Sequence, residues 1–307
     1  MRFSIYQESR QGKRANNEDR IAYCYSRDAV LMVVADGMGG HFYGEVASQI
    51  AVQYLTAAFQ REAQPALADP FLFLHKGMTN AHHAILDFVN ENKLKDSPRT
   101  TCVACVIQNN IAYWAHVGDS RLYHIRKHHV IGMTRDHSRV RLLVDQGVIS
   151  EKEAETHPDK NKVYTCLGGN QLPEIEFSKK TPLESGDFLI LATDGVWGPI
   201  DTETLISSIE EGNFMQAVPR LLDKSELAGG PHGDNLSIIA VRWDDNYEAP
   251  TEDAISTHTM AMDEVQTQMQ EFGRSTQAER TKKLDLTEDE IEKAINEIRA
   301  AINKFSK

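Results

Sequence analysis

The sequence has few cysteines, fewer basic than acidic residues and no long apolar run, and each of these features argues against a class of protein. Its 307 residues carry a formal net charge of −12, which argues against a nucleic-acid partner, because surfaces that bind nucleic acid are usually basic. No stretch approaches the roughly 20 consecutive apolar residues of a membrane-spanning helix. The N-terminal stretch lacks the apolar segment of a secretory signal peptide. We therefore expect a soluble, cytoplasmic protein without a membrane span.

The four cysteines show no pattern typical of a disulfide framework or a zinc site. Cys102 and Cys105 have the spacing Cys-x-x-Cys, but no second pair completes a zinc site. Both lie in an apolar, β-branched run, where residues three apart point to opposite faces of a strand. We interpret them as packed thiols rather than as a redox or zinc pair. Few, unpatterned cysteines also fit a reducing cytosol.

The periodicity of the apolar residues predicts an α+β fold. Apolar residues make up 41% of the chain, which is sufficient for a substantial core. Strands are expected at residues 2–8, 21–25, 29–35, 100–107, 111–117, 121–126, 130–133, 188–193 and 236–243. Helical spacing is found at residues 45–60, 71–92, 202–210 and 215–225. Strands in runs and helices in pairs favour helices packed outside antiparallel sheets.

The chain divides into three parts by composition. Residues 1–245 hold the patterned elements, residues 246–283 form a polar stretch that we interpret as a linker, and residues 284–307 form an amphipathic C-terminal helix. The last part begins with a capping box at Thr287 and Glu290. Its apolar seam consists of Ile291, Ile295, Ile298, Ile302 and Phe305. This helix either docks on its own domain or mediates contact with a second copy or a partner.

Two apolar runs, far apart in the chain, end at the same acidic signature. Residues 31–35 stop at Asp36-Gly37, and residues 188–193 stop at Asp194-Gly195. A carboxylate then projects from the end of a strand, and the glycine lets the backbone approach a ligand closely. Asp-Gly is also an ordinary turn dipeptide, so one such site alone would be weak. Carboxylates collected from several strand ends suit hard cations such as Mg²⁺ or Mn²⁺.

Five motifs in order carry a resemblance to a known family. They are Gly12-x-Arg14-x-x-Asn17-Glu18-Asp19, Asp36-Gly37-Met38-Gly39-Gly40, Gly118-Asp119-Ser120-Arg121, Thr193-Asp194-Gly195-Val196-Trp197 and Gly233-Asp234-Asn235-Leu236-Ser237. This series resembles the metal-dependent PP2C-type serine/threonine protein phosphatases, in their bacterial form, over residues 1–243. The resemblance implies a four-layer sandwich of two antiparallel sheets packed face to face and flanked by helices. The metals would lie at one edge between the sheets.

The resemblance also implies a role for each acidic residue. Asp36 would bridge two Mn²⁺ or Mg²⁺ ions, and the Gly37 carbonyl would bind one of them. The other ligands would be Asp194 and Asp234 on one ion, Glu18 or Asp19 on the other, and Asp119 on a third, weaker ion. Water shared by two cations loses a proton more easily and would attack the phosphoryl group. The sequence does not decide which of Glu18 and Asp19 touches metal directly.

Several basic residues and histidines have two possible interpretations. Arg14 matches the family's phosphate-binding arginine, and a guanidinium suits a dianionic phosphate. Met38 stands where the animal enzymes have a histidine proposed as general acid, which leaves His41 as one candidate and a loop histidine as its other interpretation. Segment 134–175 corresponds to the family's flap. Its Arg135, Arg139 and Arg141 either steer phosphopeptides or are solvated loop charges.

The sequence therefore predicts an enzyme that hydrolyses phosphoserine and phosphothreonine in proteins. Its partners would be Ser/Thr-phosphorylated proteins, including a Ser/Thr kinase or its substrates. The alternative is a catalytically idle module of the same fold that binds phosphoproteins or scaffolds a kinase. The presence of Asp36, Asp119, Asp194 and Asp234 argues against that alternative. The histidine pairs at 82–83 and 128–129 are expected to be exposed.

Overall fold

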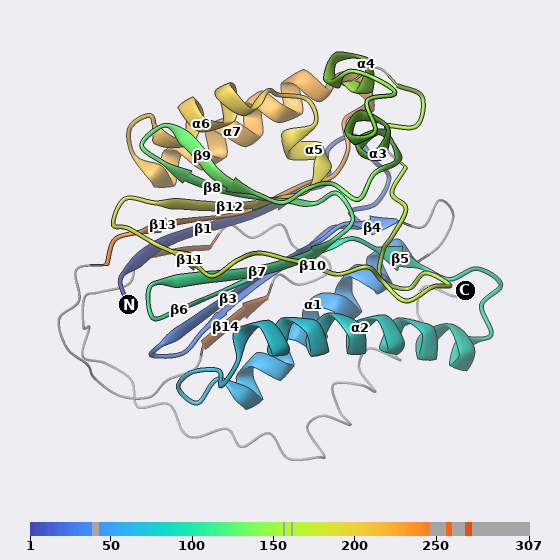
Figure 1. The fold of residues 1–307 in the computed structure, drawn as a ribbon, viewed down its shortest axis with the longest axis horizontal. Coiled ribbons are helices and arrows are strands. Elements are labelled where there is room, and N and C mark those ends of the chain that lie inside the picture. Colours follow the sequence, from blue (N-terminus) through green and yellow to red (C-terminus); the bar gives the residue numbers. More distant parts are fainter. Residues whose placement is uncertain (39–42, 156, 161, 246–255, 260–267, 272–307) are drawn as a thin grey trace. The chain divides into compact units, whose positions relative to one another are not determined.

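The computed structural model describes residues 1–38, 43–155, 157–160, 162–245, 256–259 and 268–271. Within this part, two antiparallel sheets pack face to face (Figure 1). The first sheet has the order β15 (Gln268–Glu271), β1 (Phe3–Arg10), β13 (Leu236–Trp243), β12 (Phe188–Ala192), β8 (Arg121–Arg126) and β9 (His129–Met133). The second has the order β10 (Glu176–Phe177), β7 (Ile111–Val117), β6 (Cys102–Gln108), β3 (Ala29–Ala35), β2 (Arg20–Tyr25) and β14 (Ser256–Thr259), with β11 (Thr181–Pro182) also paired to β7.

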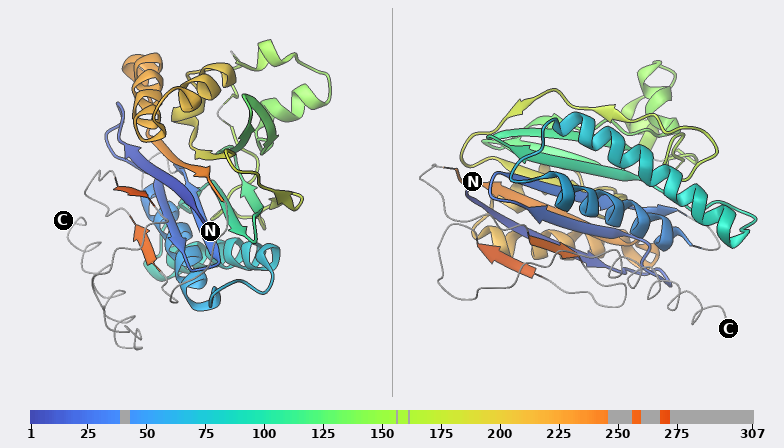
Figure 2. Two further views of the ribbon diagram at one scale, coloured as in Figure 1. Left: turned by 90° about the vertical axis from the view of Figure 1, so that its left-hand side faces the viewer. Right: turned by 90° about the horizontal axis from the view of Figure 1, so that it is seen from below.

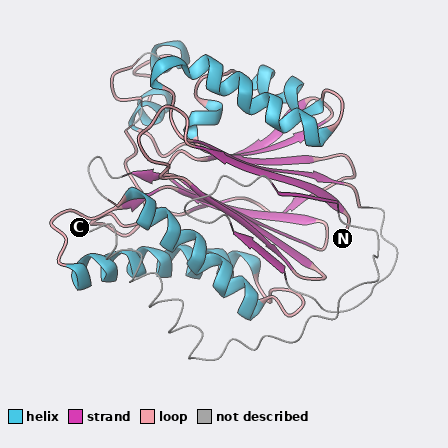
Figure 3. Ribbon diagram, turned by 180° about the vertical axis from the view of Figure 1, so that it is seen from behind, coloured by secondary structure: helices cyan, strands magenta, loops and turns pink. Residues whose placement is uncertain are grey.

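Helices cover the outer face of each sheet, so the four-layer prediction is confirmed (Figure 3). The second sheet is covered by α1 (Gly44–Glu62) and α2 (Pro70–Asn92), which lie side by side (Figure 2). The first sheet is covered by α5 (Asp194–Trp197), α6 (Thr202–Glu210) and α7 (Phe214–Gly229). The predicted flap contains α3 (Arg139–Asp145) and α4 (Glu151–Glu155). A short 3₁₀ turn, Gly230–His232, precedes β13.

Strand β3 shows why the layers form. Its residues are fully buried and alternate between two apolar clusters. Leu31 and Val33 pack toward α1 and α2, whereas Met32 and Val34 pack toward the opposite sheet. A strand buried on both faces reads as a continuous apolar run, because successive side chains point to opposite sides. The same alternation separates Cys102 from Cys105, and both are buried free thiols, as predicted.

Two expectations are corrected by the structure. The segment expected as linker contributes the strands β14 and β15, which pair with the outer strands β2 and β1. An edge strand leaves backbone groups unpaired, so a polar segment can pair with it through the main chain without an apolar signature. His82 was expected to be exposed but is buried, and its Nδ1 accepts a hydrogen bond from Gly168 N at 3.1 Å. His83, His128 and His129 are exposed.

The predicted C-terminal helix, 284–307, lies outside the described residues. The helix and the boundary in front of it therefore stay predictions. Among the described residues, none of the helices combines the length and the apolar character that crossing a bilayer requires.

Candidate metal centre

The strand registers bring the acidic motifs to one edge of the two sheets. In the second sheet, Arg20 pairs with Ala35, so Asp19 and Asp36 sit at the same end of neighbouring strands β2 and β3. Asp19 lies on the segment by which the chain crosses from β1 in the first sheet to β2 in the second. These two carboxylates, 17 positions apart in sequence, are therefore set at the junction of the sheets.

The first sheet contributes the remaining carboxylates at the same edge. Ala192, the last residue of β12, pairs with Arg121 on one side and Ile238 on the other. Asp194 follows the end of β12, Asp119 precedes the start of β8, and Asp234 precedes the start of β13. Asp119 lies on the short turn that carries the chain from β7 back to the first sheet. The five aspartates predicted as ligands are thus brought together from both sheets.

The aspartates influence each other strongly enough to change their pKa values. Burial, and after it the charge of Asp19, raises the pKa of Asp36 well above its ordinary value, and Asp194, Asp119 and Asp234 add to the effect. Burial raises the pKa of Asp19 to about 7, although hydrogen bonds from Ser237 and Thr193 oppose the change.

The pKa values of Asp194, Asp119 and Glu18 are also raised. Burial, followed by the charge of Asp234, raises the pKa of Asp194 to about 6. Burial and Asp194 raise that of Asp119 well above its usual range. Burial and Glu45 raise the pKa of Glu18. Carboxylates that repel each other in a buried site need a compensating positive charge to stay ionised together.

Asp194 carries the clearest sign of a missing partner. Its Oδ1 is buried and makes no hydrogen bond to any described residue. Buried polar atoms are almost always paired, so such an atom calls for an explanation. A divalent cation that takes oxygen ligands supplies one, and the oxygen-only donor set matches Mg²⁺ and Mn²⁺. The residues present therefore fit the predicted metal ions.

The backbone around Asp36 is fixed by threonines that the sequence analysis did not single out. Thr100 Oγ1 and Thr101 N both donate to the Asp36 carbonyl, at 2.8 and 2.9 Å. Thr101 Oγ1 accepts a hydrogen bond from Asp36 N at 3.1 Å and is 2.7 Å from Ser120 Oγ. The sequence shows only that two β-branched polar residues stand at the start of a predicted strand. Their hydrogen bonds to the Asp36 backbone depend on the pairing of distant strands, which the sequence alone does not show.

The glycine after each aspartate is needed for close packing. A Cβ on Gly37 would lie 2.4 Å from the Gly44 carbonyl oxygen and 2.6 Å from that of Glu18. A Cβ on Gly195 would lie 2.0 Å from the Asn235 carbonyl oxygen. Both contacts are far too short for real atoms, so any side chain would displace the acidic loops. The glycines hold Glu18, Asp194 and Asp234 in place by allowing neighbouring loops to touch.

Asn235 connects the last motif of the series to the first by hydrogen bonds. Its side chain donates to the carbonyl oxygens of Gln11 and Asn16 and accepts from Glu18 N at 2.9 Å. These hydrogen bonds hold the segment that carries Arg14, Glu18 and Asp19 against the start of β13. Asn235 belongs to the last of the five motifs, but the sequence analysis predicted no role for it.

Arg14 stands at the mouth of this cluster. Its Nη2 donates to Asp234 Oδ2 at 2.6 Å, and its side chain is 56% exposed. The hydrogen bond with Asp234 raises the pKa of Arg14, so the guanidinium is always charged. A cation anchored to an acidic cluster and open to solvent suits a phosphate that enters from outside.

The flap arginines are engaged within the flap. Arg135 pairs with Asp145, Arg139 with Asp159 at 3.0 Å, and Arg141 with both Asp145 and Glu151 at 2.9 Å. These pairs are largely exposed and therefore weak. They nevertheless place an acidic group against each guanidinium, which reduces the attraction for a phosphopeptide.

Two positions bear on the general acid. Met38 is in β4 (Gly37–Met38), paired with β5 (Arg99–Thr100), and its thioether cannot donate a proton. His41 lies outside the described residues. Its role as a proton donor stays a prediction.

A second group of metal-ligating side chains lies beyond the aspartates. Atoms of His116, His137 and Glu176 lie within 4.8 Å of one another. However, His137 Nδ1 accepts from Gly118 N at 3.2 Å, so the neutral ring carries its proton on Nε2, facing Glu176 at 3.4 Å. His116 Nε2 is 2.7 Å from the Arg135 carbonyl oxygen. We interpret this group as a hydrogen-bond network that holds the start of the flap against β7.

The fold and the acidic cluster together define a hydrolase class that works with divalent cations. Residues 6–227 match the family described as Protein phosphatase 2C. This match covers most of the chain, and the chain belongs to that family.

Three individual similarities agree with this assignment. The serine/threonine protein phosphatase PstP of Mycobacterium tuberculosis is 31% identical over 226 residues, which is 74% of this chain and 42% of that protein. The chain thus spans less than half the length of PstP. The solved Streptococcus agalactiae serine/threonine phosphatase has a TM-score of 0.72 at 27% identity, covering 79% of this chain and 100% of the other. A PstP catalytic domain solved with two manganese ions has a TM-score of 0.67 at 29% identity, covering 79% and 100%.

Proposed function

We propose that this chain hydrolyses phosphoserine and phosphothreonine in proteins with two bound Mn²⁺ or Mg²⁺ ions. The observation that carries the proposal is the convergence of five aspartates from both sheets, with the buried Asp194 Oδ1 lacking a hydrogen-bond partner among the described residues. The manganese-bound PstP domain of the same fold supports the choice of metal. Bound divalent cations would offset the charge of the carboxylates and lower the pKa of water at the site.

The residues of the chain then have distinct tasks. By the family resemblance, Asp36 would bridge the two ions and the Gly37 carbonyl would bind one of them. Thr100 and Thr101 hold the loop that carries both. Asp194 and Asp234 would bind one ion, and Glu18 or Asp19 the other. The remaining carboxylate, Asp119, would hold a third, weaker ion.

Of the two candidates in the first motif, Glu18 is better placed to bind a metal ion, and Asp19 is better placed to support the site from behind. Its Oδ2 already accepts a hydrogen bond from Thr193 Oγ1 at 2.9 Å, and the residue is only 2% exposed. Glu18 is less buried, and its Oε2 is directed at the Gly44 backbone, beside Gly37. A metal ion that enters from solvent would reach Glu18 more easily than Asp19.

Arg14 would orient the phosphoryl group. Its bond with Asp234 fixes one nitrogen and leaves further N–H groups as donors for phosphate oxygens. A lysine would supply a point charge instead of a planar fork, so Arg14→Lys should raise KM more than it lowers kcat.

The partners follow from the reaction. Substrates would be Ser/Thr-phosphorylated proteins, and a Ser/Thr kinase or its substrates would supply them. The cytoplasm is the proposed location, and the four free cysteines fit it.

The C-terminal helix, 284–307, would dock on the domain or mediate contact with a second copy. A truncation after residue 273 tests this, because it removes the predicted helical segment and keeps β14 and β15. Light scattering with size exclusion should give a lower oligomeric state for the truncated chain if the helix forms dimers. Equal monomeric masses would exclude dimer formation.

The activity is tested by phosphate release from a phosphothreonine peptide, with Mn²⁺ and with excess EDTA. The variants are Asp194→Ala and, as a matched control, Asp87→Ala, an exposed position on α2. We expect Mn²⁺-dependent activity in the wild type and the control, and a loss of at least about 100-fold in Asp194→Ala. Folded, Mn²⁺-loaded wild type without activity would refute the proposal and favour the binding module.

A further inference from the structure

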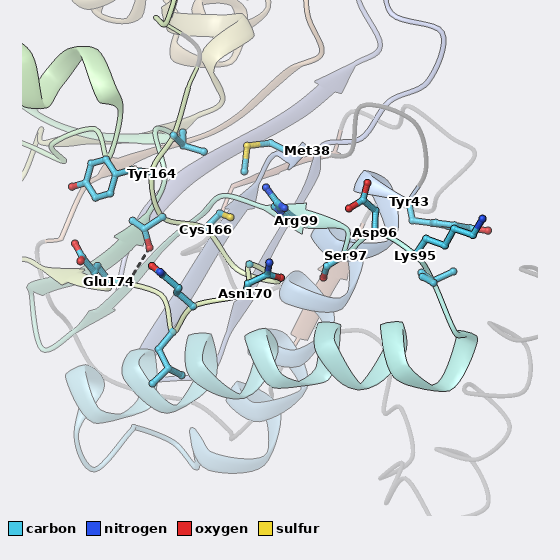
Figure 4. Close-up of a pocket in the computed structure, with 16 residues that line it drawn as sticks. Met38, Tyr43, Lys95, Asp96, Ser97, Arg99, Tyr164, Cys166, Asn170 and Glu174 are labelled. Atoms are coloured by element: carbon cyan, nitrogen blue, oxygen red, sulfur yellow. Dashed lines mark hydrogen bonds between the residues drawn. The ribbon is translucent and has the colours of Figure 1, made fainter.

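A large cavity opens beside the candidate metal centre. Its volume is about 960 Å³, and it lies between the strand β5 and the last part of the flap. Figure 4 shows Met38, Arg99 and Cys166 close together in its middle, with Tyr164 toward one end and Lys95 toward the other. A cavity of this size can hold several residues of an extended peptide.

One end of the cavity lining adjoins the loop that carries Asp36. Arg99 and Met38 are paired residues of β5 and β4. The next residue, Thr100, donates its hydroxyl to the Asp36 carbonyl at 2.8 Å. A peptide whose phosphoryl group reaches Asp36 would therefore pass its neighbouring residues over Arg99.

The floor of the cavity is firmly connected to the fold. Thr100 and Leu167 exchange two backbone hydrogen bonds, at 3.1 and 2.9 Å. Ser97 Oγ donates to the Gly168 carbonyl at 2.7 Å, and the buried His82 accepts from Gly168 N. The flap end and β5 thus form one surface that is set before a ligand arrives. Preformed surfaces bind with a smaller ordering cost.

Arg99 differs from the flap arginines in its surroundings. Its exposed side chain makes no ion pair or hydrogen bond within the described part of the chain, whereas Arg135, Arg139 and Arg141 are each paired with an acidic residue. Arg99 and Cys166 both line the cavity, and the charge of Arg99 opposes the effect of burial on the pKa of the Cys166 thiol.

The cavity lining carries two cations and two anions. Lys95 is also exposed and unpaired among the described residues, while Asp96 and Glu174 carry negative charge on the same lining. Asp96 and Lys95 are adjacent in sequence, so their charges offset each other near one end. Of the two cations, Arg99 lies nearer the loop that carries Asp36, because it pairs with Met38.

We propose that Arg99 is a specificity residue that pairs with an acidic side chain next to the phosphorylated residue of the substrate. The inference rests on the phosphatase function proposed above and names a substrate class for it: phosphopeptides with Asp or Glu beside the phosphoresidue. The chain as a whole is acidic, with a net charge of −12. Acidic peptides are repelled by such a chain in general, so a single local cation determines where one can bind.

The test compares three phosphothreonine peptides of equal length, with Asp, Ala or Lys flanking the phosphoresidue on either side. Each is assayed at low ionic strength for kcat/KM with the wild type, Arg99→Ala, Arg99→Glu and Arg99→Lys. The matched control is Arg220→Glu, an exposed arginine of α7 on the opposite sheet that forms no ion pair among the described residues. Thermal unfolding checks that every variant is folded.

The wild type should prefer the Asp peptide over the Lys peptide by about fivefold, the size expected for one partly exposed ion pair. The preference should vanish in Arg99→Ala, reverse in Arg99→Glu, persist in Arg99→Lys and Arg220→Glu, and shrink in 0.5 M salt. An equal preference in the wild type and Arg99→Glu, or none in the wild type, would overturn the inference.

A small substrate separates this inference from the proposed function. The wild type should hydrolyse p-nitrophenyl phosphate in Mn²⁺, since that molecule has no flanking residue. Failure of that reaction would count against the phosphatase function itself. Intact hydrolysis with peptide selectivity that ignores Arg99 would refute only the role of Arg99.

Discussion

Removing the charge of Asp194 is expected to stabilise the metal-free protein while it abolishes activity. Burial, and after it Asp234, raises the pKa of this carboxyl from 3.8 to about 6. One unit of pKa corresponds to about 1.4 kcal/mol, so the ionised group costs the folded, metal-free protein at most about 3 kcal/mol. Asp194→Asn removes that cost, and we expect a gain of about 1–3 kcal/mol. For a domain of this size, the melting temperature would rise by about 2–10 °C.

The size of this effect depends on pH. Because the folded-state pKa is raised, the cost is absent below about pH 4, where the group is protonated in both states, and complete above about pH 7. The advantage of Asp194→Asn over the wild type should therefore grow across that interval. In Mn²⁺ the order should reverse, because the metal binds and stabilises the folded wild type.

The assay is urea or thermal denaturation in excess EDTA at pH 5 and pH 8, repeated with Mn²⁺. Asp87→Asn, an exposed change on α2, is the control and should stay within about 0.5 kcal/mol of the wild type. A variant that is less stable than the wild type in EDTA at pH 8 would refute the reasoning. So would a difference that does not change with pH.

Three further predictions test the surroundings of the site. Thr193→Val keeps the shape but leaves Asp19 and the Ser237 amide without their buried partner, so unfolding in EDTA should become easier by about 1–3 kcal/mol in urea titrations. Gly37→Ala forces a Cβ against backbone oxygens and should reduce Mn²⁺-dependent phosphate release at least about 100-fold, while wild-type-like rates would contradict the packing argument. Asp187→Asn breaks a buried network with Arg126 and should cost about 3 kcal/mol on denaturation with kcat preserved, because β12 begins there, at the end away from Asp194.

Much of the candidate site could be predicted because its chemistry is local in sequence. Asp36 and Asp194 each directly follow an apolar run, so the same short stretch of sequence predicts both the end of a strand and the carboxylate at that end. The period-2 and period-3.6 patterns predicted antiparallel sheets with helices outside them, and the family resemblance implied the four layers. The registers were needed to place these residues, since only strand pairing shows that Asp19, Asp36 and Asp119 lie at one edge.

The parts that escaped prediction depend on contacts between distant residues. The buried His82 is explained by Gly168, which lies 86 positions further along the chain. The strands β14 and β15 carry polar residues and are added through backbone pairing, which leaves no hydrophobic pattern. Arg141–Asp145 is an i,i+4 pair that the sequence itself could suggest, whereas Arg139–Asp159 needed the folded flap.

The most direct test of the central claim is a count of Mn²⁺ bound at equilibrium by the purified chain, in the wild type and in Asp36→Asn. Isothermal titration and metal analysis after dialysis give this number independently of any substrate. Our account predicts two tightly bound ions in the wild type, as in the solved PstP domain, and at most one in Asp36→Asn, because the bridging carboxylate offsets the repulsion between the ions. Undiminished Mn²⁺ binding in Asp36→Asn, or none in the wild type, would contradict the assignment of this acidic cluster as the metal centre.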